Sequence, residues 1–253
     1  MTLETMHYFP ASLISGSLPM GGWIPDTPVY AVQDVPIVDA GYNPEGMVKT
    51  VLDVDDKIAF YVDNVISETE ANTLIALTER LGYNSAAPGI QTPPGMRMNK
   101  SVHWLDDSEF LSVLFQRLQP FLPAQLDGQA LASMFSQRIN MYKYDCNDVF
   151  NRHIDGDWPA YHLDEKSQRM VEQRNIWSKL TMLLYLNGHE DGIEGGQTRL
   201  YRADKTSVIV NPQKGRALFF RHGHGVDSVL HEGVTVTGTT SKYVARINVM
   251  YHL

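Results

Sequence analysis

Cysteine is almost absent from the sequence: Cys146 is the single one among 253 residues. A lone cysteine excludes an intrachain disulfide, and it excludes a zinc site built from cysteine ligands. The chain also lacks the basic start and following apolar run of a secretory signal. These absences predict a reducing, cytoplasmic location. No apolar run approaches the roughly 18 residues that span a bilayer, so we expect no membrane partner.

Positive charge is scarce as well. Lys and Arg total 21 against 29 Asp and Glu, which gives a formal net charge of -8 at pH 7. Because nucleic-acid affinity comes largely from neutralising phosphates, we expect no nucleic-acid partner. Hydrophobic residues make up 43% of the chain, which predicts a globular protein with its own core. The sequence carries no signal for the oligomeric state.

Two regions of the chain differ in pattern. Residues 1–50 are rich in proline and glycine and contain only short β-type runs. This composition predicts an irregular N-terminal arm that packs on the rest of the chain. Residues 51–253 carry longer periodic segments and are predicted to form a single domain.

Two amphipathic helices are expected near the start of this domain. Ser67 and Glu70 have the spacing of a capping box, in which each side chain bonds the main-chain N–H of the other residue. The apolar residues that follow keep helical spacing as far as Gly82, and glycine commonly ends helices. A second helix is predicted from about Asp107 to Leu118, ahead of two prolines.

From Phe135 onward, short β-like segments alternate with turn-forming clusters. The expected strands lie at residues 135–144, 149–154, 178–187, 197–201, 207–211, 216–221, 226–231, 233–237 and 242–251. Regular short strands favour a β-sandwich or a jelly roll over an α/β fold. The polar stretch at 163–175 is predicted to be a helical or disordered insertion. The expected fold class is therefore mainly β, with supporting N-terminal helices.

The pair His153 and Asp155 suggests a metal site. On a strand, residues i and i+2 point to the same face, so an imidazole and a carboxylate are presented side by side. His231, at the end of a β-like run, is the candidate for a third ligand. Two histidines and one carboxylate leave one side of a metal open, which suits non-haem Fe(II).

Other interpretations of the histidines stay open at this point. His222 and His224 also have i, i+2 spacing, with Asp227 nearby, and they form a competing pair. The short His153-x-Asp155 motif is also compatible with a surface turn. The remaining histidines have no partner at ligand spacing: His7, His103, His162, His189 and His252.

The surrounding sequence resembles the 2-oxoglutarate- and Fe(II)-dependent dioxygenases, specifically the prolyl 4-hydroxylase-like branch. The resemblance is carried by residues 138–144, 150–156, 178–187, 195–198, 212–215, 217–220, 231–233 and 242–251. Their order and spacing match the family across residues 97–253, more weakly across 55–96, and not across the first 50. One departure is the turn at 145–148, where the family usually has a glycine. Here Asn147 can take the left-handed conformation instead.

The resemblance implies a double-stranded β-helix, also called a jelly roll, with Fe(II) bound by His153, Asp155 and His231. It implies 2-oxoglutarate and O2 as cosubstrates, and it allows ascorbate as an additional cofactor. The implied reaction is hydroxylation of an unactivated C–H bond in a small molecule or in an amino-acid or prolyl side chain, with decarboxylation of 2-oxoglutarate to succinate. Two alternatives remain: desaturation or cyclisation of a metabolite at the same site, and a non-catalytic metal-binding jelly-roll sensor.

The far carboxylate of 2-oxoglutarate requires a cation, and the last expected strand offers Lys242 and Arg246 on one face. In the wider superfamily a basic residue on this strand is often followed two residues later by Ser or Asn. Arg246 followed by Asn248 fits that pattern and is favoured, with Lys242 as the alternative. The resemblance also places Tyr144 against the cosubstrate, while Tyr185 and Thr198 are weaker candidates.

We expect the substrate to be recognised by segments outside the barrel, because loops carry specificity in folds of this kind. The two candidates are the loop at 88–104 and the insertion at 157–177. Their candidate side chains are Arg97, Asn99, Lys100, His103, Trp104, Trp158, Tyr161, His162 and Trp177.

Overall fold

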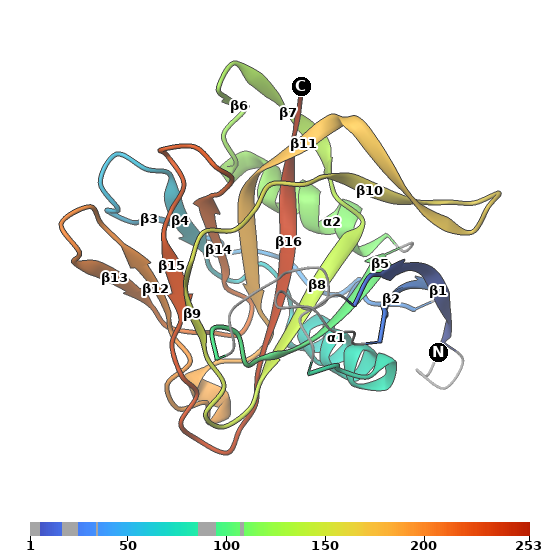
Figure 1. Ribbon diagram of the computed structural model, residues 1–253, viewed down its shortest axis with the longest axis horizontal. Helices are drawn as coiled ribbons and strands as arrows, with labels where there is room; N and C mark the ends of the chain where they lie inside the picture. The colour runs from blue at the N-terminus through green and yellow to red at the C-terminus, as the bar shows by residue number, and fades with distance from the viewer. Residues whose placement is uncertain (1–5, 17–24, 34, 86–94, 107–108) are drawn as a thin grey trace.

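The computed structural model describes residues 6–16, 25–33, 35–85, 95–106 and 109–253. Within these residues the chain forms a 12-stranded sheet and a 4-stranded sheet (Figure 1). The mainly β, jelly-roll class that the sequence predicts is confirmed. No helix in the described part of the chain is long and apolar enough to cross a membrane.

The large sheet runs through the middle of the molecule. In spatial order its strands are β1 (His7–Ile14), β2 (Thr27–Gln33), β5 (Lys100–Asp106), β8 (Arg138–Tyr144), β16 (Lys242–His252), β11 (Arg169–Tyr185), β14 (Ala217–Arg221), β4 (Ala59–Val62) and β3 (Lys49–Val51). Three more strands attach to this path: β6 (Gln125–Leu126), β7 (Gln129–Phe135) and β10 (Pro159–Asp164). The small sheet has the order β13 (Ser207–Val210), β12 (Thr198–Tyr201), β15 (His231–Gly233) and β9 (Phe150–His153).

Two α-helices, α1 (Glu68–Leu81) and α2 (Phe110–Leu118), cover one face of the large sheet (Figure 1). The capping box of α1 is confirmed, since Ser67 Oγ accepts from the N–H of Glu70 and Glu70 Oε2 accepts from the N–H of Ser67. Gly82 ends this helix at a φ of 85°. Arg117 of α2 pairs with the buried Glu70 at 2.8 Å, which joins the two helices. Two short 3-10 helices follow, η2 (Gln119–Phe121) and η3 (His189–Asp191).

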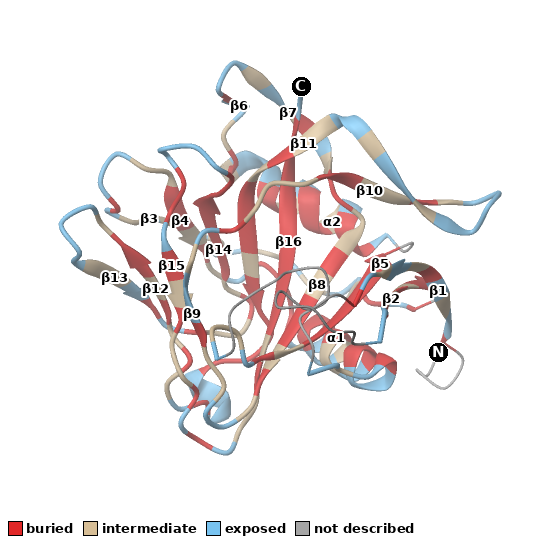
Figure 2. Cartoon of the chain, in the orientation of Figure 1, coloured by how far each residue is buried: buried red, intermediate tan, exposed pale blue. Residues whose placement is uncertain are grey.

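Alternation along β8 and β16 separates a structural face from a functional face. Met141 and Ile247 belong to the core cluster that includes both helices. Their neighbours in sequence point to the opposite face, where the small sheet packs and where Leu200 of β12 joins Val244 in a second cluster. Figure 2 shows both central strands buried over most of their length. The functional face is therefore built on a rigid part of the fold.

The N-terminal arm is more regular than predicted. Strands β1 and β2 pair with each other, and β2 pairs in parallel with β5, with Val29 opposite His103. The expectation of an irregular arm is wrong for these two segments, because their short β-type runs find a partner that lies far away in sequence. The domain boundary at residue 50 stays a prediction.

The expected insertion at 163–175 is a β-hairpin. Strands β10 and β11 pair antiparallel, with His162 opposite Val171, and the chain turns at Gln168 with a φ of 55°. The prediction of a helix or of disorder is wrong because residues 164–175 pair as strands although none of them is buried. Its sequence therefore lacks the apolar alternation that marks a half-buried strand.

Three other boundaries differ from expectation. The expected loop at 88–104 contains the start of β5, while its residues 88–94 lie outside the described part of the chain. The expected strands at 226–231 and 233–237 shrink to β15, because the chain turns through 223–228 before it. The second helix starts at Phe110 rather than near 107.

Candidate metal centre and cosubstrate pocket

Three predicted ligands converge on the functional face. His153 on β9 lies directly opposite His231 on β15. Asp155 lies two residues beyond the end of β9. Its carboxylate is therefore positioned next to His153 by the loop that follows the strand, and not by the i, i+2 geometry of a strand. His153 Nε2 lies 3.6 Å from Asp155 Oδ1, and His231 Nε2 lies 3.7 Å from Asp155 Oδ2. All three ligand atoms lie within 4.8 Å of one another, and no second group of this kind occurs among the described residues.

Both imidazoles are oriented for metal binding. His153 Nδ1 lies 2.7 Å from the carbonyl oxygen of Asn151, and His231 Nδ1 lies 3.1 Å from that of Val229. A carbonyl only accepts, so each Nδ1 carries the proton and each Nε2 keeps a free lone pair. Burial, together with the neighbouring His153, lowers the pKa of His231 to about 3 and keeps it neutral. The histidine pair therefore fits a divalent cation.

The carboxylate of Asp155 is braced from two sides. Thr181 Oγ1 on β11 donates a hydrogen bond to Oδ2 at 2.7 Å, and Arg246 Nε on β16 lies 3.3 Å from the same oxygen. Burial alone would raise the pKa of Asp155, but Arg246 and the two imidazoles hold it well below its usual range. The ligand is therefore ionised and held in one orientation.

The competing histidine pair does not form a metal site. His222 is buried, with Nδ1 2.8 Å from Thr181 Oγ1 and Nε2 2.8 Å from Ser178 Oγ. The side chain of His224 is 90% exposed and lies 3.8 Å from Asp157. His222 instead supports Thr181, which in turn holds Asp155. Sequence reasoning missed this relay, because nothing in the local pattern distinguishes Thr181 from a core strand residue.

A narrow pocket runs from the three ligands toward Lys242. Lys242 is 2% exposed, and its Nζ donates to the carbonyl of Gly196 at 2.6 Å. Lys242 Nζ lies 4.8 Å from the ring centre of Tyr144, and Tyr144 is the residue directly opposite Lys242 on β8. Within the described part of the chain, no carboxylate pairs with Lys242, and burial lowers its pKa to about 7. Thr198 also lines the pocket, where it accepts a hydrogen bond from Tyr185.

The two cations on β16 have different surroundings. Arg246 reaches the same pocket at its metal end, where it pairs with Asp155 and donates to the carbonyl of Gly156 at 3.2 Å. Asn248 lines a separate cavity and does not contribute to this pocket. Arg246 therefore already has an anionic partner, whereas Lys242 has none among the described residues.

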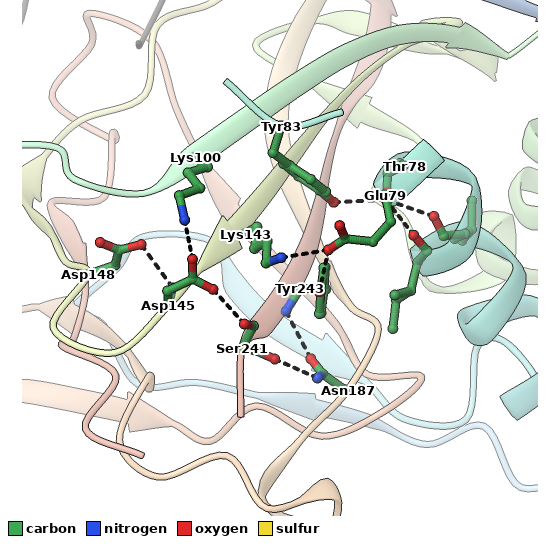
Figure 3. Close-up of polar contacts among 12 residues, drawn as sticks. Thr78, Glu79, Tyr83, Lys100, Lys143, Asp145, Asp148, Asn187, Ser241 and Tyr243 are labelled. Atoms are coloured by element: carbon green, nitrogen blue, oxygen red, sulfur yellow. Dashed lines mark hydrogen bonds and ion pairs between the residues drawn. The ribbon is translucent and has the colours of Figure 1, made fainter. Parts of the chain in front are cut away.

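The strand ends that carry Tyr144 and Lys242 are tied together by Asp145 (Figure 3). Asp145 accepts hydrogen bonds from Lys100 on β5 and from Ser241, which precedes β16. Asn187, which follows β11, donates to the carbonyl of Ser241 at 2.9 Å and so connects the start of β16 to the end of β11. These contacts keep the opposed pair Tyr144 and Lys242 in register.

The turn at 145–148, between β8 and β9, lacks the glycine that the resembled family usually has, and Asn147 takes its place as expected. Asn147 takes the left-handed conformation with a φ of 71°. The side chain of Asp148 accepts from the N–H of Asp145 at 2.8 Å, which closes the turn. Asparagine therefore replaces the usual glycine without displacing the neighbouring strands.

The candidate substrate residues divide into two groups. Four of them line a second cavity of about 140 Å³ beside Arg246: Arg97, His103, Trp158 and Tyr161. The other five lie elsewhere. Trp104 is core, and Lys100 pairs with Asp145. Trp177 donates to Asp157, and Asn99 accepts from Arg97. His162 lies on β10, outside the lining.

Comparisons with known proteins agree with this geometry. Residues 139–250 match the family model described as the 2OG-Fe(II) oxygenase superfamily. No curated protein sequence matches the chain. One similar solved structure is the viral collagen prolyl hydroxylase vCPH from Paramecium Bursaria Chlorella virus-1 in its 2OG complex. It has 19% identity and a TM-score of 0.53, over 80% of this chain and 100% of that one.

Two further structures have the same fold. A prolyl-4-hydroxylase from Pseudomonas putida has 17% identity and a TM-score of 0.55, over 78% of this chain and 95% of that one. The other is a prolyl hydroxylase from Trichoplax adhaerens in complex with a hypoxia inducible factor oxygen degradation domain peptide fragment. It has 17% identity and a TM-score of 0.56, over 79% of this chain and 85% of that one. The superfamily implies Fe(II), 2-oxoglutarate and O2, and the ligands His153, Asp155 and His231 fit iron. The dioxygenase prediction is thus confirmed for residues 139–250, which match the model of the 2OG-Fe(II) oxygenase superfamily.

Proposed function

We propose that this protein hydroxylates an unactivated C–H bond in a small molecule or in an amino-acid or prolyl side chain, while 2-oxoglutarate is converted to succinate and carbon dioxide. One observation carries the proposal. The three ligands His153, Asp155 and His231 converge at one end of a buried pocket, and its other end holds Lys242, which has no carboxylate partner among the described residues. A ligand with a metal-binding end and a carboxylate end matches both ends of this pocket.

The side chains have separable roles in this proposal. The two Nε2 atoms and the Asp155 carboxylate would hold Fe(II), which supplies the redox chemistry that activates O2. Thr181 and Arg246 orient the Asp155 carboxylate, a type of support that metal ligands commonly need. Phe150 stacks on the His153 ring at 3.4 Å and limits its rotation.

For the far carboxylate of 2-oxoglutarate we favour Lys242 over Arg246, the reverse of the preference from sequence. Arg246 is engaged by Asp155, so a second carboxylate would compete with the metal ligand. Lys242 is buried without an ion pair in the described part of the chain, and such a charge is costly until an anion neutralises it. The Tyr144 hydroxyl, in the same pocket, would donate to that carboxylate.

The test is succinate formation by the purified protein with Fe(II) and 2-oxoglutarate, followed by mass spectrometry of candidate substrates. Hydroxylation adds about 16 Da, whereas desaturation removes about 2 Da, so the product separates the two outcomes that the sequence left open. His153→Ala should eliminate succinate formation. If the wild-type and His153→Ala proteins form equal amounts of succinate, the proposed site is wrong.

A further inference from the structure

The cavity beside Arg246 lies on the same sheet face as the proposed iron site, and the two share Arg246 and Tyr142 as lining residues. β8 contributes Arg138 and Asn140 to its wall, and β5 contributes His103. The β1–β2 pair and the β10–β11 hairpin flank β5 and β8 on this side of the molecule (Figure 1). Ile14 of β1, Tyr161 of β10 and Trp158, which precedes β10, contribute apolar surface to the lining. Such walls favour a small ligand over an extended peptide.

The charge in this cavity is unbalanced. Neither Arg97 nor Arg138 pairs with a carboxylate in the described part of the chain. Arg97 Nη2 and Arg138 Nε are buried and make no hydrogen bond there. The third arginine, Arg246, is neutralised by Asp155. Two guanidinium groups therefore face a small cavity without an anion, an arrangement that is costly unless a ligand supplies one.

Two acceptors accompany these donors. His103 is 4% exposed, and its Nδ1 lies 2.7 Å from Asn140 Oδ1. Because this amide oxygen only accepts, Nδ1 carries the proton, and Nε2 is a buried acceptor without a partner in the described chain. Asn248 is 6% exposed, and its Oδ1 is likewise buried without a partner among the described residues. A matching ligand thus needs an oxyanion for the arginines and a nearby N–H or O–H for the acceptors.

We propose that this cavity binds the primary substrate and that the substrate is a small carboxylic acid with an adjacent hydrogen-bond donor, namely an α-amino or α-hydroxy acid. The inference rests on the proposed oxygenase function and narrows its substrate class. The planar fork of arginine matches a carboxylate, and the buried acceptors of His103 and Asn248 match the ammonium or hydroxyl group.

The register of the sheet orients this substrate. Asn140 lies opposite Arg246, which contacts the ligand Asp155. Arg138 lies two residues further along β8, a distance of about 7 Å. A carboxylate held by Arg138 is thus kept away from the metal, and the carbon chain extends toward it. A carbon several bonds from the carboxylate, rather than the α-carbon, is the one that reacts.

The experiment uses saturation-transfer NMR on the metal-free protein with a pool of the standard L-amino acids and L-lactate. Each hit is then titrated by calorimetry beside its carboxamide and beside inorganic phosphate. At least one acid should bind, with its carboxamide at least tenfold weaker. Arg138→Gln should weaken binding of that acid at least tenfold, and Arg97→Gln should weaken it in the same direction. Arg174→Gln, an 88% exposed arginine on β11, is the matched control and should bind normally.

The outcomes separate this inference from the proposed function. Mn(II) and 2-oxoglutarate affinities are measured on the same variants and should stay within twofold of wild type. If the wild-type protein binds neither Mn(II) nor 2-oxoglutarate, the oxygenase proposal is wrong. This result would leave the substrate inference intact, because the acid is titrated without metal. The substrate inference is overturned if no acid binds, if acid and carboxamide bind equally, if Arg138→Gln and Arg97→Gln bind the acid normally, or if only phosphate binds.

Discussion

Arg246 Nε lies 3.3 Å from Asp155 Oδ2, so this buried cation of the functional face is paired with a proposed iron ligand. The arginine lies between two cavities and lines both of them. On one side is the pocket that ends at Lys242, and on the other is the cavity that contains Arg97 and Arg138. This ion pair therefore lies, with Tyr142, between the proposed cosubstrate pocket and the proposed substrate cavity.

Metal binding should depend on His231 and not on His224. His231→Ala removes one of three converging ligands, so the Mn(II) affinity measured by calorimetry should fall by at least 100-fold. His224→Ala alters the exposed residue of the competing pair and should bind Mn(II) as wild type does. Equal loss in both variants, with both proteins folded by circular dichroism, would contradict the assignment.

Thr181 should affect the metal without touching it. Thr181→Val keeps the shape of the side chain but removes the hydroxyl that donates to Asp155 at 2.7 Å. Loss of such outer support typically costs about 10- to 100-fold in metal affinity. Thr181→Ser retains the hydroxyl and should restore most of the affinity. A Thr181→Val protein that binds Mn(II) normally would show that Arg246 alone orients the carboxylate.

The two cations of β16 should have separable effects. Lys242→Met should weaken 2-oxoglutarate binding by at least 100-fold with Mn(II) affinity preserved, because it removes the unpaired charge of the pocket. Arg246→Met should mainly weaken Mn(II) binding, because it leaves Asp155 without its ion pair. Lys166→Met, in the exposed turn of the β10–β11 hairpin, is the control for loss of a lysine. The opposite pattern would restore Arg246 as the anchor.

Stability should respond to pH through Lys242. Its pKa falls from 10.5 in the unfolded chain to about 7 in the folded one because the amine is buried. The unfolded state therefore binds more protons between these values, and this residue destabilises the folded protein as the pH falls from about 10 to 7. Lys242→Met should raise the free energy of unfolding at pH 6 by an amount on the order of 3 to 5 kcal/mol and by little at pH 10. Urea unfolding at both pH values measures this difference, and a pH-independent effect would contradict it.

Tyr144→Phe tests the hydroxyl group near Lys242. The ring stays in place, while one donor to the proposed carboxylate is lost, at a cost of about 1.5–3 kcal/mol. This corresponds to a 2-oxoglutarate affinity roughly 10- to 150-fold lower. Tyr185→Phe is the matched control, because the Tyr185 hydroxyl already donates to Thr198 at 2.6 Å. An unchanged affinity in Tyr144→Phe would make this tyrosine a packing residue only.

Features encoded by local pattern were predictable from the sequence. The capping box of Ser67 and Glu70, the left-handed Asn147 and most central strands follow from spacing and backbone preference within a few residues. The proposed ligands His153, Asp155 and His231 were also named from spacing and family resemblance. These predictions succeed because the physical causes, side-chain period and backbone sterics, act over short distances along the chain.

Partnerships between distant residues were decided only by the tertiary structure. The sequence places Lys242 and Arg246 on one strand face and favours Arg246 as the anchor, but sheet register brings Arg246 to Asp155 and leaves Lys242 without an anion among the described residues. Similarly, residues 27–33 form strand β2 in a region expected to be irregular, because they pair with the distant strand β5. Electrostatic energy depends on the distance between charges and on the surrounding dielectric, and both are set by which strands meet.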